Sequence, residues 1–387
     1  GQFGTRLMGG KDAASARYVF TKLESITRCI FHPEDDALLN YLDEDGQAIE
    51  PDFYVPIIPM LLVNGSDGIG TGWSTSVPTY NPRDLIKNLR NMIVGEPQFE
   101  MSPWYRGFTG EIRAKTGKEF RNYVCSGNAD LLDDDTLMIN ELPIGKWTTD
   151  YKQMLESMVV GGTPADGGAP PIIRDIRENH TDTTVSFTVR MSEGVLETLC
   201  NEPGGVFKKF KLDGSIATSN MNAFDLKNKI KKYETVKEIM EQFFDVRMDF
   251  YEKRKASLIN KLTMDYEKLD NKVRFILAVI NGSIVVSNRK KNDILADLQR
   301  QKFKAIFPEK SHKAATEGEG DEEGEEVMAP TSLDKGYDYL LGMKLWSLTM
   351  EKVQTLTNDR NQKDAELSIL RAKTPEDLWN HDLDMLE

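Results

Sequence analysis

The sequence predicts an α+β protein that continues into a long helical arm. Three observations support this fold class. Short strand-like runs separated by turn residues occupy residues 105–215, a helical apolar period runs from 236 onward, and the composition is 39% hydrophobic and 29% charged. Such a composition can bury real cores, and 387 residues leave room for two or three domains.

The first predicted element is a helix over residues 12–31. Asp12 or Ser15 could cap its start. Apolar side chains then recur near helical spacing, at Tyr18, Leu23, Ile26 and Ile30.

The next stretch, residues 41–80, is dense in prolines and glycines. It predicts a buried extended run, YVPIIPMLLVNG, that enters a glycine-rich loop. A helix is expected over 83–94, directly after Asn81-Pro82.

The middle of the chain predicts strands and one helix. The helix is TDYKQMLESMVV at 149–160, the segment 161–171 is an exposed loop by composition, and the acidic run 130–135 is interpreted as a turn between strands. The predicted strands are 109–117, 121–127, 136–143, 183–191 and 207–214.

From residue 236 the apolar residues recur at three- and four-residue steps, with no Gly or Pro until Asn281-Gly282. A helix of that length would measure roughly 65–70 Å at 1.5 Å per residue. A second periodic segment, 347–372, is expected to run back antiparallel to it, with a compact piece at 284–345 between them. A long hairpin with a small globule at its tip is favoured over a plain helical bundle.

The net charge of −13 is unevenly distributed. The run EGEGDEEGEE at 317–326 carries seven acids and no base, whereas residues 1–28 and 206–235 are locally basic. Local patches decide whether a polyanion can dock, so nucleic acid remains a possible partner, against the plainer interpretation of solvated basic faces. Three distant cysteines indicate neither a disulfide framework nor a zinc site, and no apolar run predicts a membrane span.

The loop NGSDGIGTGW at 64–73 places Ile69 between Gly68 and Gly70. It lacks the Lys-Ser/Thr of a phosphate-binding P-loop and does not fit G-x-G-x-x-G. The alternatives are a buried glycine turn or an apolar wedge of the kind that enters between base pairs and kinks a duplex.

The run KDAASARYVF at 11–20 places small residues before Arg17 and Tyr18. A tyrosine can attack a phosphodiester, and an adjacent guanidinium can hold the phosphate. Taken alone the pattern is weak, because most Arg-Tyr pairs are a surface base beside a half-buried aromatic ring.

The run GQFGTRLMGGKDAASARYVF resembles the active-site tyrosine region of eukaryotic DNA topoisomerase II, a type IIA topoisomerase. EPDFYVPIIPMLLVNGSDGIGTGWS resembles the next signature block of that family, and the similarity continues through INELPIGKWTTDYK, GYDYLLGMKLWSLT and TPEDLW. It covers essentially the whole chain in the family's order. The A-type polypeptide of bacterial gyrase is a weaker match, because GQFGTR and PIIPMLLVNG are typical of the eukaryotic enzymes.

The resemblance implies specific roles for seven residues. Tyr18 matches the nucleophile that joins a DNA 5′ phosphate, Arg17 matches its neighbour, and Ile69 matches the isoleucine that intercalates and bends the DNA. Lys11 and Ser15 match groups that contact the DNA backbone, and Arg6 and Lys146 are expected to be further DNA-binding residues. No metal-binding or cofactor-binding residue is expected within this chain.

The resemblance also implies a domain order. Residues 1–40 would end a winged-helix domain, 41–235 would form an α/β tower, and 236–387 would form the coiled coil and a dimerising C-gate globule, with an acidic disordered loop at 314–330.

The implied whole enzyme is a nuclear homodimer that acts on double-stranded DNA, needs Mg²⁺ and ATP, and is not bound to a membrane. Both cofactors would bind N-terminal to these 387 residues, so the fragment alone is expected to be inactive. Ala16 and Met8 depart from the proline and histidine that many family members carry. The alternative function is a non-catalytic architectural DNA-binding protein with a coiled-coil arm, in which Tyr18 would be incidental.

Overall fold

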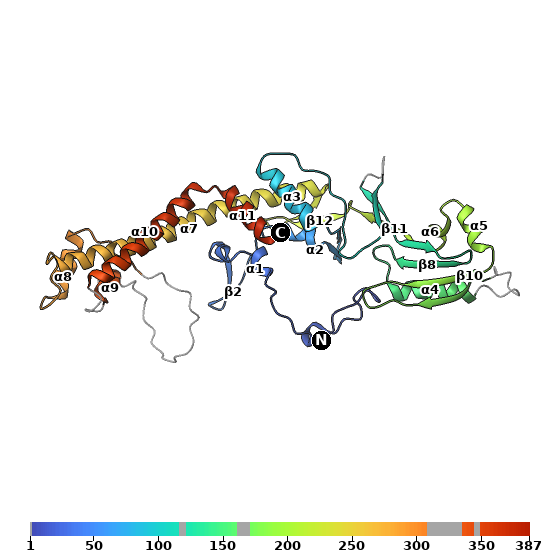
Figure 1. Cartoon of the computed structure of the whole chain (residues 1–387), viewed down its shortest axis with the longest axis horizontal. Helices are drawn as coiled ribbons and strands as arrows, with labels where there is room; N and C mark the ends of the chain where they lie inside the picture. The colour runs from blue at the N-terminus through green and yellow to red at the C-terminus, as the bar shows by residue number, and fades with distance from the viewer. Residues whose placement is uncertain (1, 116–120, 161–170, 308–334, 344–348) are drawn as a thin grey trace. The chain divides into compact units, whose positions relative to one another are not determined.

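The computed structural model describes residues 2–115, 121–160, 171–307, 335–343 and 349–387. The predicted acidic loop 314–330 lies outside the described residues, as does all of the predicted loop 161–171 except its last residue. The chain forms two compact units. Figure 1 shows the chain coloured by residue number. The first unit contains Gly1–Ile30, Pro56–Val246 and Met385–Glu387; the second contains Phe31–Val55 and Arg247–Asp384.

The predicted helix over 12–31 is wrong. Only a 3-10 turn, η1 (Ala16–Tyr18), and a short helix, α1 (Thr27–Ile30), form there. The Asp12 carboxylate accepts hydrogen bonds from the Thr5 backbone N–H and hydroxyl, so it closes the preceding loop instead of capping a helix. Tyr18, Leu23 and Ile26 of the apolar period are 62%, 78% and 52% exposed, so in this structure the period does not pack on a core.

The core of the first unit includes the segment that precedes the glycine loop. Ile57, Ile58 and Leu62 are buried as predicted, but Tyr54 is 58% exposed, and Met60–Asn64 form helix α2 rather than an extended run. The helix follows Pro59 and ends at Gly65, whose φ of 66° favours glycine. Two strands, β3 (Ser66–Gly70) and β4 (Trp73–Val77), and helix α3 (Pro82–Ile93) follow, and α3 confirms the prediction.

A four-stranded antiparallel sheet has the order β7-β8-β10-β9. Helix α4 (Thr148–Val160) supplies Tyr151 and Leu155 to the core on this sheet. The predicted helix is confirmed. The acidic run 130–135 ends strand β7 with Asp130 and Leu131, and only 132–135 form the predicted turn before β8. The strands are β7 (Asn128–Leu131), β8 (Thr136–Glu141), β9 (Ile173–Glu178) and β10 (Phe187–Met191).

A three-stranded sheet has the order β11-β6-β5, with strands β5 (Glu111–Ala114), β6 (Asn122–Ser126) and β11 (Asp213–Ala217). The predicted strand 207–214 is largely wrong, because it begins inside helix α6 (Gly205–Lys209), which follows α5 (Val195–Asn201). The spacing of three between Phe207 and Phe210 places both on one helical side, and both belong to the sheet core. A last hairpin pairs β12 (Met221–Phe224) with β13 (Ile230–Tyr233).

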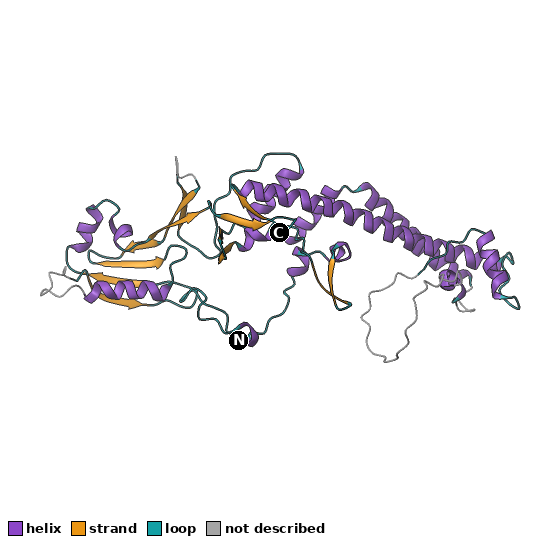
Figure 2. Ribbon diagram, turned by 180° about the vertical axis from the view of Figure 1, so that it is seen from behind, coloured by secondary structure: helices purple, strands orange, loops and turns teal. Residues whose placement is uncertain are grey.

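Helix α7 (Val236–Ile280) is a 45-residue helix that starts at the predicted residue 236, and α10 (Met350–Ala372) lies alongside it in the long pair of helices of Figure 2. In the second unit, Arg360 Nη1 lies 3.0 Å from Asp270 Oδ1, and Lys255 Nζ donates to the Arg371 carbonyl at 3.3 Å. From Lys255 to Asp270 the residue number rises along α7, whereas the number of the partner on α10 falls from 371 to 360. The two helices are therefore antiparallel. The predicted helical hairpin is therefore confirmed.

The described part of the predicted globule at 284–345 packs around its own core. The core joins residues of α7 to α8 (Lys291–Arg300), η5 (Lys335–Tyr337) and α9 (Asp338–Leu341). The remaining elements of this unit are η2 (Pro33–Leu38), β1 (Tyr41–Glu44), β2 (Gln47–Pro51) and α11 (Pro375–Leu386). The last two residues of α11, Met385 and Leu386, belong to the first unit.

Candidate catalytic and nucleic-acid-binding site

Tyr18 ends the three-residue turn η1 and is 62% exposed. The Tyr18 N–H donates to the Ser15 carbonyl at 2.9 Å, and the Val19 N–H donates to the Ala16 carbonyl at 3.1 Å. The guanidinium carbon of Arg17 lies 5.0 Å from the centre of the Tyr18 ring. The backbone thus holds an exposed phenol beside a cation, where a large substrate can reach it.

The loop before this turn is tightly closed. Thr5 donates to Asp12 from its N–H at 2.9 Å and from its hydroxyl at 2.5 Å. These bonds, the backbone bond first, hold the pKa of Asp12 below its ordinary value. Gly9 has a φ of 62° and lies so close to the Trp147 indole that a Cβ would meet it at 2.3 Å. The loop is therefore fixed to the four-stranded part of the same unit.

Arg6 and Lys146 line one pocket of about 760 Å³, together with aromatic side chains that include Trp147. The Arg6 side chain forms an ion pair with the buried carboxylate of Glu141. The Arg6 backbone N–H donates to the Asp182 carbonyl at 3.1 Å. Lys146 Nζ donates to the Lys211 carbonyl at 2.5 Å. The structure brings these two predicted DNA-binding residues together and gives each a protein partner.

Lys11 and Ser15 lie on the exposed stretch that leads into η1. The Lys11 N–H donates to the Met8 carbonyl at 3.3 Å, and its side chain is exposed. Ser15 occupies the N-cap position of η1, but its hydroxyl forms no capping hydrogen bond. Lys11, Ser15, Arg17 and Tyr18 thus present their side chains along one short exposed segment.

Ile69 lies on β3, directly opposite Ser74 of β4, and is 92% exposed. The glycines at the ends of the hairpin explain its position. A Cβ on Gly65 would lie 2.7 Å from the Val77 carbonyl, and Gly72 has a φ of 77° in the turn. The structure supports the prediction that Ile69 points outward rather than into a core.

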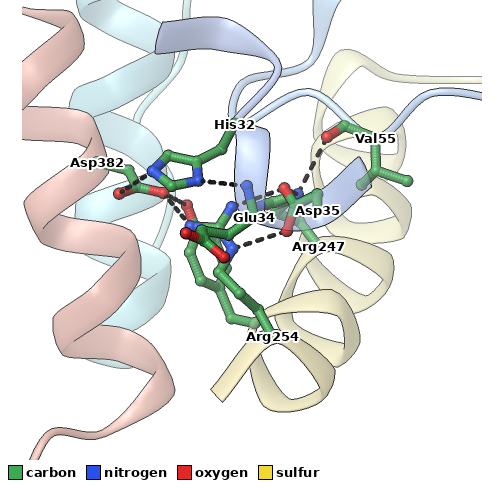
Figure 3. A network of polar contacts seen from close by, with 8 residues as sticks. His32, Glu34, Asp35, Val55, Arg247, Arg254 and Asp382 are labelled. Atoms are coloured by element: carbon green, nitrogen blue, oxygen red, sulfur yellow. Dashed lines mark hydrogen bonds and ion pairs between the residues drawn. The ribbon is translucent and has the colours of Figure 1, made fainter. Parts of the chain in front are cut away.

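A buried ionic network in the second unit was not predicted from the sequence (Figure 3). Arg254 binds Asp35 through Nε at 2.7 Å and Nη2 at 2.6 Å, and binds Asp382 through Nη1 at 2.5 Å. Arg247 Nη1 lies 2.8 Å from Asp35 Oδ2 and donates to the Val55 carbonyl at 3.0 Å. The network joins the segment 31–55 to α7 and α11.

One sequence signal could have indicated this network. Arg247 and Arg254 are seven residues apart, so they share one face of α7 with the buried residue Tyr251. Both guanidiniums lie over the Tyr251 ring, at 4.1 Å and 4.5 Å from its centre. Charged residues on an apolar helix face need buried partners.

Within the described ranges, no group of three or more His, Cys, Asp or Glu side chains is arranged to hold a metal ion. A search of the described helices for a segment long and apolar enough to cross a membrane finds none.

Comparison with known proteins places the chain in a family. The family model for the A subunit of DNA gyrase/topoisomerase IV matches residues 1–384. The chain is 45% identical over 400 residues to DNA topoisomerase 2 of Arabidopsis thaliana, covering 100% of this chain and 26% of that protein. It is 43% identical over 385 residues to DNA topoisomerase 2-alpha of Gallus gallus, covering 99% of this chain and 24% of that protein.

A solved structure is also similar. The DNA-binding, cleavage and re-ligation domain of Plasmodium falciparum topoisomerase II matches with a TM-score of 0.79 and 40% identity, over 100% of this chain and 51% of that chain. The predicted fold class and the predicted resemblance to eukaryotic topoisomerase II are confirmed. The chain spans about a quarter of the length of the curated relatives named above. It belongs to the family of the DNA gyrase/topoisomerase IV A subunit.

Proposed function

We propose that this chain is the DNA-cleavage and dimer-gate region of a type IIA DNA topoisomerase. The observation that carries the proposal is the exposed Tyr18 beside Arg17, in a chain that matches topoisomerase 2 proteins over its whole length. The whole enzyme would change the topology of double-stranded DNA by breaking both strands, passing a second duplex and rejoining the ends.

In the proposed reaction, the phenolic oxygen of Tyr18 attacks a phosphodiester phosphorus. A bond forms between that oxygen and phosphorus, the bond to the 3′ oxygen breaks, and the 3′ hydroxyl leaves with a proton while the 5′ phosphate stays on the protein. The reverse reaction restores the strand, because one phosphodiester has been exchanged for another. Ligation therefore needs no energy source of its own.

Arg17 is proposed to hold the attacked phosphate. A phenol has an ordinary pKa of about 10, so its attack needs help at neutral pH. A guanidinium can bind two phosphate oxygens and offset the charge that develops during the reaction. Without DNA the Arg17 guanidinium lies over the Tyr18 ring, so we expect it to turn toward the phosphate when DNA binds.

The remaining predicted site residues are proposed to position the duplex. Ile69 would enter a base step and kink the DNA, which suits a side chain that is 92% exposed on a paired hairpin. Lys11 and Ser15 would contact the backbone near the break. Arg6 and Lys146 are proposed as weaker contacts, because each already has a protein partner.

We propose a two-fold dimer formed through residues 284–345, the C-gate of the predicted domain order. Support comes from apolar side chains that are exposed on and beside the described part of this globule, namely Ile280, Val285, Val286 and Phe307. The winged-helix, tower and coiled-coil boundaries at 40 and 235 belong to the same proposal.

Mg²⁺ and ATP are proposed to bind outside these 387 residues, and the enzyme is proposed to work in the nucleus, as the similarity to eukaryotic topoisomerase 2 proteins implies. The steps above are written for residues of this chain alone. We expect the purified fragment to dimerise but not to relax supercoiled plasmid, with or without Mg²⁺ and ATP.

The test uses the complete enzyme with and without Tyr18→Phe. The wild-type enzyme should yield DNA that stays covalently attached after denaturation, whereas Tyr18→Phe should bind DNA with similar affinity and yield none. Adducts from a homogeneous Tyr18→Phe dimer would overturn the assignment. An enzyme that binds DNA but never forms an adduct would instead support the architectural alternative.

A further inference from the structure

The second unit carries an acidic hairpin that the proposed function does not use. Residues 31–55 contain eight acids and no lysine or arginine. Asp35 belongs to the buried network around Arg254. Most of the other acids lie in the hairpin of β1 and β2, and we call residues 40–54 the acidic hairpin. Its five carboxylates are those of Asp43, Glu44, Asp45, Glu50 and Asp52.

The acidic hairpin is fixed firmly at its base. Arg247 Nη1 lies 2.8 Å from Asp35 Oδ2 and donates to the Val55 carbonyl at 3.0 Å (Figure 3). One buried guanidinium thus joins the residues before and after the hairpin. Closer to the strands, the Asp52 N–H donates to the Asn40 carbonyl at 2.9 Å. The base of the hairpin is therefore held by helix α7.

Beyond its base the hairpin is regular but uncovered. Asp45 and Gly46, with φ of 52° and 81°, form the kind of turn that suits two antiparallel strands. All four residues of β1 are exposed, and successive side chains of a strand point to opposite faces, so both faces of β1 are open. In the described sheets, β1 and β2 pair only with each other. Since two strands alone are marginally stable in water, a third strand would stabilise them.

The hairpin combines apolar and acidic surface. Four apolar side chains near its base are between 41% and 58% exposed, namely Tyr41, Leu42, Phe53 and Tyr54. Within the described residues, none of the five carboxylates of the hairpin forms an ion pair. Acids on an open edge protect it from pairing with a copy of itself. Such protection does not explain the exposed aromatic rings, which are typical of a contact site.

Charge selects the class of partner. The carboxylates repel the phosphates of DNA and the same hairpin of a second copy. They attract lysine and arginine, whose aliphatic stems can pack on aromatic rings while the charge stays in water. The basic stretch 1–28 of this chain carries the proposed DNA contacts of Lys11 and Arg17, so it is not free when DNA is bound. A basic segment of a separate protein remains.

We propose that the acidic hairpin binds a lysine- and arginine-rich extended segment of a separate protein as a third strand. Backbone hydrogen bonds to the open edge would provide affinity, and the carboxylates would select basic side chains. This contact goes beyond the proposed function, because it would hold the enzyme beside a basic protein while the DNA-binding surface stays free.

The experiment uses the complete enzyme and a short labelled peptide in which lysine alternates with valine, with binding measured by fluorescence anisotropy. The double change Asp43→Asn with Glu50→Gln should raise the Kd about fivefold, because exposed ion pairs are individually weak. Phe53→Ala should raise the Kd about threefold without changing its salt dependence. A peptide methylated on alternate backbone nitrogens lacks donors for strand pairing and should bind about tenfold more weakly.

The matched control is Glu193→Gln with Glu202→Gln, two exposed acids of the first unit, which should bind the peptide as wild type does. The acidic run 317–326 can also attract the peptide, but it is the same in every variant. Formation of the DNA adduct on Tyr18 should be equal in all variants, so this test is separate from that of the proposed function.

Three results would overturn the inference. Wild-type affinity in the Asp43→Asn, Glu50→Gln variant would remove the carboxylates from peptide binding. Equal affinity for the methylated and unmethylated peptides would exclude a third strand. Unchanged peptide binding with altered DNA affinity, or with altered dimerisation in sedimentation, would assign the hairpin to the DNA path or to the contact between subunits.

Discussion

The segment around Tyr18 and the network around Arg254 handle their polar side chains in opposite ways. Tyr18 is exposed and ends a three-residue turn, with the Arg17 guanidinium beside its ring. Arg254 is buried, and each of its three guanidinium nitrogens donates to a carboxylate. A group proposed to react with a macromolecule must be reachable, whereas a buried ion needs an opposite charge or it destabilises the fold.

The largest expected effect concerns the buried side of this comparison. Arg254→Ala should destabilise the protein by about 3–5 kcal/mol, because it leaves Asp35 and Asp382 buried without their main partner. Urea unfolding measures the change. The matched control is the preceding residue, Lys253, whose ion pair with Asp249 is exposed; Lys253→Ala should cost only about 0.3–0.5 kcal/mol. Equal losses of unfolding free energy in the two variants would show that the buried network stabilises the fold no more than an exposed ion pair does.

The second prediction concerns the exposed side. Arg17→Ala should slow DNA cleavage by the complete enzyme by about 100-fold, because the reacting phosphate is misplaced. DNA affinity should change little, since one phosphate contact among many is lost. Arg17→Lys keeps the charge but loses the planar fork, so an intermediate rate is expected. Cleavage at the wild-type rate in Arg17→Ala would contradict the phosphate-holding role.

The third prediction is a pH dependence of the buried network. Burial first, and then the charge of Arg254, hold the pKa of His32 below its ordinary value of 6.5, against the opposing charges of Asp382, Asp35 and Glu34. Burial alone would raise the pKa of Asp35, but hydrogen bonds and charges from Arg254 and Arg247 outweigh it and lower the pKa below 3.8. In both cases the folded state binds its proton less readily than the unfolded state does.

Stability should therefore fall as the pH drops below about 6.5, and fall further below about 4. The control is His32→Asn, which keeps a side-chain acceptor for the Glu34 N–H, now donated to His32 Nδ1 at 3.2 Å. Unfolding measured from pH 7.5 to 5.5 should lose its pH dependence in this variant. An unchanged slope would remove His32 from the account.

The smallest expected effect concerns the turn before Tyr18. Ala16 is the first residue of η1, and Ser15 has φ −56° and ψ 140°, which a following proline favours. Ala16→Pro should stabilise the folded turn by about 0.4–1 kcal/mol, because proline restricts the unfolded chain. The cleavage rate should rise by at most about fivefold. Ala13→Pro is the control, because the Ala13 N–H donates to the Gly10 carbonyl at 3.1 Å and that bond would be lost. Faster cleavage with Ala13→Pro than with Ala16→Pro would contradict this view of the turn.

The sequence predicted best what depends on local pattern. The arm from 236 to 280 follows from an uninterrupted helical period. The glycines around Ile69 left a buried turn and an exposed wedge as alternatives, and the 92% exposure of Ile69 rules out the buried turn. The roles assigned to Tyr18 and Arg17 came from the family resemblance and stay predictions, as do those of the other site residues and the domain boundaries.

Two features depended on residues outside the stretch of sequence being interpreted. The segment 12–31 has a helical period, but Thr5 uses the carboxylate that would have capped a helix. The network around Arg254 joins partners more than 100 residues away in sequence, such as Asp382 and Asp35. Nothing in a single stretch of sequence shows which distant carboxylates will meet a buried arginine.

The most direct test of the central claim is to identify the residue that carries the DNA. The complete enzyme is trapped on DNA with denaturant, digested with nuclease and protease, and analysed by peptide mass spectrometry. We predict one modified peptide, with a nucleotide linked through its 5′ phosphate to the oxygen of Tyr18. A nucleotide on any other residue, or linked through its 3′ phosphate, would contradict the account.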